Sequence, residues 1–216
     1  TCIHLNDGYI MTCYHVIDLA LSLIEISFSH DIHTRCVKDI ADNIFVCFDY
    51  VSYDKEPTWM ELDEKLKRFG DNLDFVILKL AVNPESVPFG GLCEDGEPKG
   101  KVALIGHPGG DLREIDFTDI VLPAKRDEMA RNKCTRKYGT HLYGYKDFMS
   151  VDRVTYDTSF FHGASGSPVI NTSGKLVAMH TSGLLLEQKK TVRYILEIGV
   201  EIRAIINYVR KHNPEL

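Results

Sequence analysis

The chain has 216 residues, a formal net charge of -6, 44% hydrophobic residues and 26% charged residues. That length suffices for one large domain with a substantial core, and the composition excludes a disordered chain or one that coats nucleic acid through its overall charge. No apolar run approaches the ~18 residues of a membrane span, and no signal peptide is recognisable. We expect a cytosolic or nuclear domain, cut from a longer protein because Thr1 falls inside the first predicted lobe.

Residues 8–14 form an apolar run that we interpret as a strand ending at His15. Similar runs, separated by turn residues, follow at 24–29, 43–48, 75–80, 102–105, 115–121, 169–170, 176–179 and 194–198. Short strands at this spacing are typical of antiparallel barrels. We predict an all-β fold of two antiparallel six-stranded β-barrels, one over residues 1–97 and one over 98–216, joined by a Gly- and Pro-rich strap at 84–100.

Three segments depart from this pattern. Residues 56–70 predict a short amphipathic helix that packs on the first lobe. Residues 125–137 are rich in basic side chains, and we interpret them as a solvated loop, with contact to DNA phosphates as the alternative. Apolar residues at helical spacing predict a C-terminal amphipathic helix over 199–213, with Ile202, Ile205, Ile206 and Val209 on its docked face.

The cysteines show no legible disulfide framework. The chain has six of them, at irregular spacing: Cys2, Cys13, Cys36, Cys47, Cys93 and Cys134. If Asp7 and Gly8 form a two-residue hairpin turn, Cys2 and Cys13 face each other across the ladder, and we expect them to be reduced thiols. Because there is no Cys-x-x-Cys motif and His30 and His33 lack convincing further ligands, we predict no metal and no cofactor.

Three residues have the types and the order of a nucleophilic triad. His15 follows an apolar strand, Asp74 stands directly before another, and Ser165 lies in the Gly-rich run 163–168. A serine hydroxyl is a weak nucleophile until a base takes its proton, and the order His, Asp, Ser is that of the chymotrypsin branch. We predict His15 as general base, Asp74 as its orienting acid and Ser165 as nucleophile, with the amides of Gly163 and Ser165 as oxyanion donors. Asp71 is the alternative acid.

Several motifs resemble known proteases. Thr-Cys-x-His-Val-Ile at 12–17, Leu-Asp-x-x-Ile-Leu-Lys-Leu at 73–80 and Ile-Gly-His-Pro at 105–108 resemble trypsin-like proteases, including the HtrA type. Residues 155–168 and 174–180 resemble the protease domain of the "family with sequence similarity 111" proteins. The resemblance covers nearly the whole chain and is weaker at 50–70 and 123–146. It implies a nuclear serine endopeptidase, protein substrates, replication-fork or chromatin partners, and a role in DNA damage or antiviral defence.

The resemblance also suggests how substrate binds. Ser159, six residues before the nucleophile, would form the floor of the primary pocket, and the wall would be His180, Thr181, Ser182 and Gly183. An uncharged floor cannot neutralise a buried Lys or Arg, so we predict cleavage after bulky apolar or aromatic residues, although Asp157 lies close in sequence. We expect His162 to contact the leaving-group side or to hydrogen-bond locally, and His107 to hold a turn.

Activation is predicted to differ from that of secreted trypsins. Those enzymes carry an aspartate before the nucleophile that pairs with a newly cut amino terminus, whereas this chain has Ala164. We therefore expect self-association, such as a homodimer, or substrate binding to order the loop. The alternatives to an active endopeptidase are an inactive protease-fold scaffold and a nucleic-acid-binding module.

Overall fold

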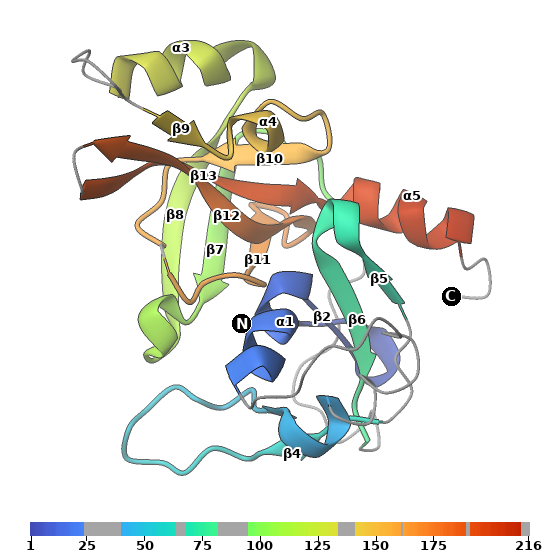
Figure 1. The fold of residues 1–216 in the computed structure, drawn as a ribbon. Coiled ribbons are helices and arrows are strands. Elements are labelled where there is room, and N and C mark those ends of the chain that lie inside the picture. Colours follow the sequence, from blue (N-terminus) through green and yellow to red (C-terminus); the bar gives the residue numbers. More distant parts are fainter. Residues whose placement is uncertain are drawn as a thin grey trace. The chain divides into compact units, whose positions relative to one another are not determined.

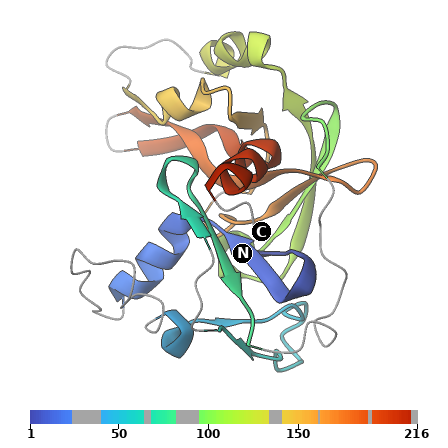
Figure 2. The same ribbon diagram turned by 90° about the vertical axis from the view of Figure 1, so that its right-hand side faces the viewer.

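The structure is a computed structural model that describes residues 1–23, 40–63, 68–81, 95–133, 141–160, 162–188 and 191–212. The predicted strand at 24–29 lies outside these ranges, as do His30, His33, Cys36, Cys93 and Cys134. The chain divides into two compact units, one of Cys2–Cys93 and one that joins Thr1 with Glu94–Leu216, and we describe each by itself (Figures 1 and 2). None of the helices in the described ranges has the length and apolarity to cross a membrane.

The first unit is built on a four-stranded antiparallel sheet in the order β1-β2-β6-β5. Its strands are β1 (Ile3–His4), β2 (Tyr9–Thr12), β5 (Arg68–Gly70) and β6 (Phe75–Lys79). A second ladder pairs β3 (Phe45–Val46) with β4 (Met60–Glu61), and an isolated bridge joins Leu62 to Leu80. Helix α1 (Tyr14–Leu23) follows β2, and the 3-10 turns η1 (Asn6–Gly8) and η2 (Asp71–Leu73) precede β2 and β6.

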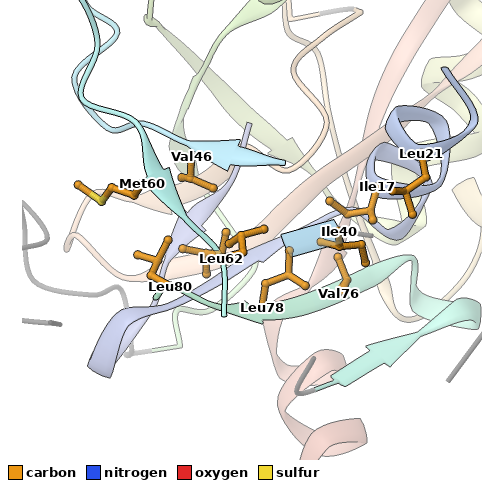
Figure 3. Packing of buried hydrophobic residues seen from close by; sticks show 10 residues of the cluster. Ile17, Leu21, Ile40, Val46, Met60, Leu62, Val76, Leu78 and Leu80 are labelled. Atoms are coloured by element: carbon orange, nitrogen blue, oxygen red, sulfur yellow. The ribbon is translucent and has the colours of Figure 1, made fainter. Parts of the chain in front are cut away.

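Ten buried apolar side chains form the core of this unit, and Figure 3 shows how they interlock. Helix α1 contributes Ile17 and Leu21, while β6 contributes Val76 and Leu78. Burying a side chain of this size stabilises the fold by about 1.5–3 kcal/mol. Because α1 and β6 share one core, the residues at their starts are held on elements that cannot move independently.

Two predictions for the first unit are wrong. Residues 60–62 are extended rather than helical, because Met60 and Leu62 are buried while Glu61 between them is exposed, which is strand alternation. The predicted hairpin turn is longer than two residues, since Ile3 pairs with Met11 and η1 lies in the connection. Continuing that register places Thr12, not Cys13, opposite Cys2. None of Cys2, Cys13 and Cys47 forms a disulfide.

The second unit contains a closed six-stranded barrel, as predicted. The ring runs β11-β7-β8-β10-β13-β12 and is closed by pairing of β11 with β12, while β9 adds to the outside of β12. The strands are β7 (Lys101–Gly106), β8 (Glu114–Val121), β9 (His141–Tyr143), β10 (Arg153–Tyr156), β11 (Pro168–Asn171), β12 (Leu176–Gln188) and β13 (Thr191–Glu201). The shorter elements η4 (Pro108–Gly110) and α4 (Tyr145–Phe148) lie in the connections. The all-β class is thereby confirmed.

The C-terminal helix is confirmed but starts later than predicted. Helix α5 spans Ile202–His212, and its buried residues are Ile202 and Ile205. Residues 199–201 remain in β13, because Gly199 and Val200 pair with both β10 and β12. Ladder hydrogen bonds on both sides hold these residues in the sheet and delay the helix.

The basic segment is a helix rather than the predicted loop. Helix α3 spans Pro123–Lys133, and the rest of the segment lies outside the described residues. Arg126 is buried and donates hydrogen bonds to the carbonyl oxygens of Phe148, Ser150 and Arg153. Arg131 pairs with Asp127, and Lys133 pairs with Asp157. Three of the four basic side chains in the described part of the segment therefore form contacts within the chain.

Candidate active site

His15 and Asp74 form a hydrogen-bonded pair in the first unit. His15 Nδ1 donates to Asp74 Oδ2 over 2.7 Å, and the backbone N–H of His15 donates to Asp74 Oδ1 over 3.0 Å. Since both carboxylate oxygens are engaged, the carboxylate cannot rotate without breaking a bond. A proton on Nδ1 leaves Nε2 of the neutral ring as the acceptor nitrogen. The pair is thus arranged to present a base.

Local backbone geometry explains how the pair forms. His15 lies in the first turn of α1 rather than at a strand end, so its side chain starts from a helical backbone. Asp74 has φ of +56°, one of two positive values among non-glycine residues in the described ranges. Such a backbone is strained by about 1–3 kcal/mol and typically persists at functional sites. The hydrogen bond from Tyr14 N to Asp74 O, 3.3 Å long, joins the two elements at this point.

A third side chain, Cys13, approaches this pair. Within the described ranges, Cys13, His15 and Asp74 each place one possible metal ligand atom within 4.8 Å of the others. A thiolate, an imidazole and a carboxylate are ligands that zinc accepts. While the His15–Asp74 hydrogen bond is made, His15 could bind a metal only through Nε2.

Ser165 belongs to the second unit, in a tight loop before β11. Gly163 and Gly166 have φ of +84° and +88°, which only glycine adopts without strain. The loop is closed by a 3.0 Å hydrogen bond from Ser167 N to Ala164 O and is tied to β12 by Gly166 N to His180 O, 2.8 Å. The Ser165 hydroxyl donates to the carbonyl oxygen of Thr181 over 3.0 Å.

A second turn supports the loop from behind. A Cβ atom on Gly163 would lie 2.8 Å from the backbone nitrogens of both Gly109 and Gly110, so no side chain fits there. His107 holds this turn as predicted, because its Nδ1 donates to Asp111 O over 2.9 Å. Partial burial lowers the pKa of His107 and favours the neutral ring. Ala164 is 0% exposed and packs in the barrel core, where a charged residue would be costly.

The predicted pocket floor lies beside an acid that sequence reasoning missed. The backbone N–H and hydroxyl of Ser159 donate to Asp116 Oδ2 over 2.9 and 3.1 Å, and Thr158 Oγ1 donates to the same oxygen. Partial burial alone would raise the pKa of Asp116, but these hydrogen bonds outweigh it and hold the pKa below its ordinary value. Asp157 pairs with Lys133, so both acids near Ser159 are engaged.

The predicted wall residues lie on β12 with different exposures. His180 is 1% exposed and bonds Tyr156 OH through Nδ1 over 2.9 Å, so it contributes its backbone rather than its ring to this wall. The hydroxyl of buried Thr181 donates to Ile198 O. Ser182 is exposed and Gly183 is half-buried. His162 bonds the hydroxyl of Tyr194, a second partner that sequence reasoning missed.

Glu197 on β13 is the third residue that sequence reasoning missed. It is 2% exposed and pairs across the ladder with Gly183. Burial, and then the negative charge of Asp157, raise the pKa of Glu197 to about 9. The sequence did contain a sign of a buried acid at this position, because Glu197 interrupts the apolar run 194–198 that predicts a buried strand.

The structure therefore brings together two of the three predicted catalytic residues. His15 and Asp74 touch in the first unit, and the loop that carries Ser165 is built from contacts of the second unit. Asp74 is the carboxylate that binds His15, while Asp71 lies in η2.

Known proteins resemble the chain along its whole length. Residues 1–179 match the family described as a trypsin-like peptidase domain. Human serine protease FAM111B is 34% identical over 234 residues, covering 100% of this chain and 31% of that protein. Mouse serine protease FAM111A is 32% identical over 239 residues, covering 98% and 36%. The chain thus spans about a third of the length of these relatives.

Solved structures share the fold at low identity. An inactive, serine-substituted form of Rv3671c from M. tuberculosis aligns with 97% of this chain and 79% of that chain, at a TM-score of 0.53 and 15% identity. The HtrA-type protease AlgW, in a substituted form with a tripeptide, aligns with 97% and 54%, at a TM-score of 0.52 and 15% identity. These alignments support the fold alone.

Proposed function

The chain belongs to the trypsin-like peptidase family, and from that premise we propose that it is a serine endopeptidase with Ser165 as nucleophile, His15 as base and Asp74 as orienting acid. The 2.7 Å hydrogen bond between His15 and Asp74 carries this proposal, because it leaves Nε2 of His15 as the proton acceptor. The Ser165 loop supports it with a hydroxyl half-buried in a glycine-bounded turn.

In the proposed reaction the Ser165 hydroxyl exchanges Thr181 O for Nε2 of His15 as its acceptor. Its oxygen attacks the scissile carbonyl carbon while its proton passes to His15, and the carbonyl electrons move onto the oxygen. The N–H groups of Gly163 and Ser165 stabilise that oxyanion. His15 then gives its proton to the leaving amine, the C–N bond breaks, and water hydrolyses the acyl-enzyme by the same route.

Substrate backbone would pair with β12. On the side away from β13, residues 176–179 of β12 pair with β11 and residues 185–187 pair with β9. Ser182, Gly183 and Leu184 lie between these stretches, and among the described strands this part of the edge has no ladder partner. An extended peptide can add to such an edge by backbone hydrogen bonds. We propose a preference for a bulky apolar or aromatic residue before the cut.

The setting and control of the enzyme are proposals from resemblance. We propose a nuclear protease that acts on chromatin or replication-fork proteins. Because the buried Ala164 has no charge to pair with a new amino terminus, we also propose that self-association orders the Ser165 loop. Specific activity should then fall on dilution through the dimer dissociation range. Equal specific activity at every dilution would contradict this control mechanism.

Labelling with a fluorophosphonate probe tests the catalytic proposal. We expect the probe to modify the wild-type protein and not the folded Ser165→Ala variant. A folded wild-type protein that takes no label, whether monomeric or concentrated, would favour an inactive scaffold. Salt-dependent DNA binding that is lost on neutralising Lys125 would instead favour a nucleic-acid module.

A further inference from the structure

The carboxyl group of Glu197 is buried without a full set of partners. The residue is 2% exposed, and Oε1 has no hydrogen-bond partner in the part of the chain that the structure describes. Its other oxygen, Oε2, is 3.7 Å from His180 Nε2, which exceeds hydrogen-bond length. A buried polar atom without a partner is costly in a folded protein, so it calls for an explanation.

The carboxyl group faces the strand proposed to bind substrate. A Cβ atom on Gly183 would lie 2.8 and 2.9 Å from the two carboxyl oxygens of Glu197, so the acid occupies the space above a residue without a side chain. Gly183 follows two residues after Thr181, whose carbonyl accepts the Ser165 hydroxyl. At a strand rise of about 3.3 Å per residue, Gly183 is roughly 7 Å along β12 from that point.

A β-bulge puts these groups on one face of the sheet. The register of β12 against β13 shifts between His180 and Ser182, so Thr181 is an extra residue. Opposed residues of a ladder share a face, and the extra residue therefore brings His180 and Gly183 to the same face as Glu197. Tyr194 connects Gly183 to the loop that carries Ser165. Its ring borders Gly183, and its hydroxyl binds His162, which lies two residues before Ala164.

We infer that Glu197 is a specificity-determining residue of the primary substrate pocket and that it lets the enzyme accept a basic side chain, Lys or Arg, as well as an apolar one before the scissile bond. This inference rests on the proposed peptidase function. It also revises the expectation of an uncharged pocket, which rested on Ser159 and did not consider Glu197.

The surroundings of Glu197 explain how one pocket takes both classes. Among the described residues, the ionisable groups that face it are His180 on β12, Tyr194 on β13 and Asp157 after β10. Burial, and then the charge of Asp157, raise the pKa of Glu197 to about 9. Near neutral pH the carboxyl group of Glu197 is therefore protonated, so this wall of the proposed pocket is uncharged and suits an aromatic ring. When an ammonium or guanidinium group enters, the carboxyl releases its proton to solvent and forms an ion pair with the cation.

The pH dependence of specificity tests this inference. We would measure kcat/KM for matched peptides with Lys, Arg or Phe before the cut, between pH 6 and 9. Any pH dependence of the acylation chemistry that the three peptides share cancels in the ratio of Lys to Phe. That ratio should rise by up to about tenfold per pH unit and level off near pH 9, because kcat/KM reports the ionisation of the free enzyme.

Two substitutions test whether Glu197 causes the pH dependence of the Lys to Phe ratio. In Glu197→Gln the Lys to Phe ratio should fall and lose its pH dependence, whereas Glu201→Gln on the same strand should leave both unchanged. A pH-independent ratio in the wild-type enzyme, or an unaltered ratio in Glu197→Gln, would overturn the inference, and the first result needs no variant to fold. Failure of the fluorophosphonate probe to label Ser165 would instead refute the proposed peptidase function.

Discussion

The molecule contains two acid–histidine pairs with opposite properties. His15 and Asp74 are 45% and 24% exposed in their side chains and are joined at 2.7 Å, whereas His180 and Glu197 are 2% and 3% exposed and lie 3.7 Å apart. In the first pair both carboxylate oxygens accept hydrogen bonds, and in the second Oε1 accepts none in the described ranges. A fully bonded carboxylate orients its histidine. A buried carboxyl group with an oxygen that accepts no hydrogen bond is instead available to bind an incoming cation.

The largest expected effect comes from breaking the first pair. Asp74→Asn should lower kcat by about 10⁴-fold, because the amide favours the wrong tautomer of His15 while leaving the fold intact. The measurement is peptide hydrolysis by protein whose thermal unfolding matches that of the wild type.

Asp71→Asn is the matched control, since Asp71 is the neighbouring acid and lies in η2. It should retain near wild-type kcat. If Asp71→Asn were the variant that lost activity and Asp74→Asn kept it, the assignment of the orienting acid would be reversed.

The next largest effect is expected from a substitution in the loop that carries Ser165. Gly163→Ala should lower kcat by about 10²–10³-fold, the range found when an oxyanion donor is lost. A Cβ at this position meets two backbone nitrogens at 2.8 Å and the residue has φ of +84°, so the loop has to move. Peptide kinetics and probe labelling measure the result.

Gly174→Ala tests the effect of backbone strain at a glycine of positive φ where the added Cβ meets no neighbouring atom. Gly174 also has positive φ, +75°, but a Cβ there has open space within 4 Å. The variant should lose about 1 kcal/mol of stability and keep its activity. Equal loss of activity in both variants would mean that the turn behind Gly163 does not position the loop.

Sequence reasoning found the first pair and missed the second for a physical reason. His15 and Asp74 could be identified because each adjoins an apolar run, and that position can be read directly from the sequence. The partner of Glu197 is set by a ladder between β12 and β13 and by the bulge at Thr181, neither of which has a signature in residue spacing. The same limit explains why residues 60–62 were predicted as helix, because their bridge to Leu80 is a contact made only in the fold.

Stability should depend on pH through the second pair. Glu197 has a pKa of about 9 in the folded protein, above its ordinary value near 4.5, so the folded state binds the extra proton between these limits. Stability should therefore be highest at low pH within that window and fall as pH rises, by about 4 kcal/mol between pH 5 and 8. Urea unfolding at several pH values measures this slope.

Glu197→Gln should flatten the slope and raise stability at pH 8, because the amide keeps the shape without an ionisation to suppress. Glu201→Gln on the same strand should flatten the slope less, because burial also raises the pKa of Glu201 but this residue is less buried than Glu197. A slope that persists in Glu197→Gln would show that other groups, rather than this carboxyl, control the dependence.

The smallest expected effect concerns what fixes the ring of His180. Tyr156 OH contacts His180 Nδ1 at 2.9 Å inside the barrel, so Tyr156→Phe should destabilise the protein by about 1 kcal/mol. A double-mutant cycle with His180→Gln should return a coupling energy of similar size, measured by urea unfolding. Additive effects would mean that the hydrogen bond does not orient the ring. His180 would then be free to turn toward Glu197, and the contrast between the two pairs would depend on burial alone.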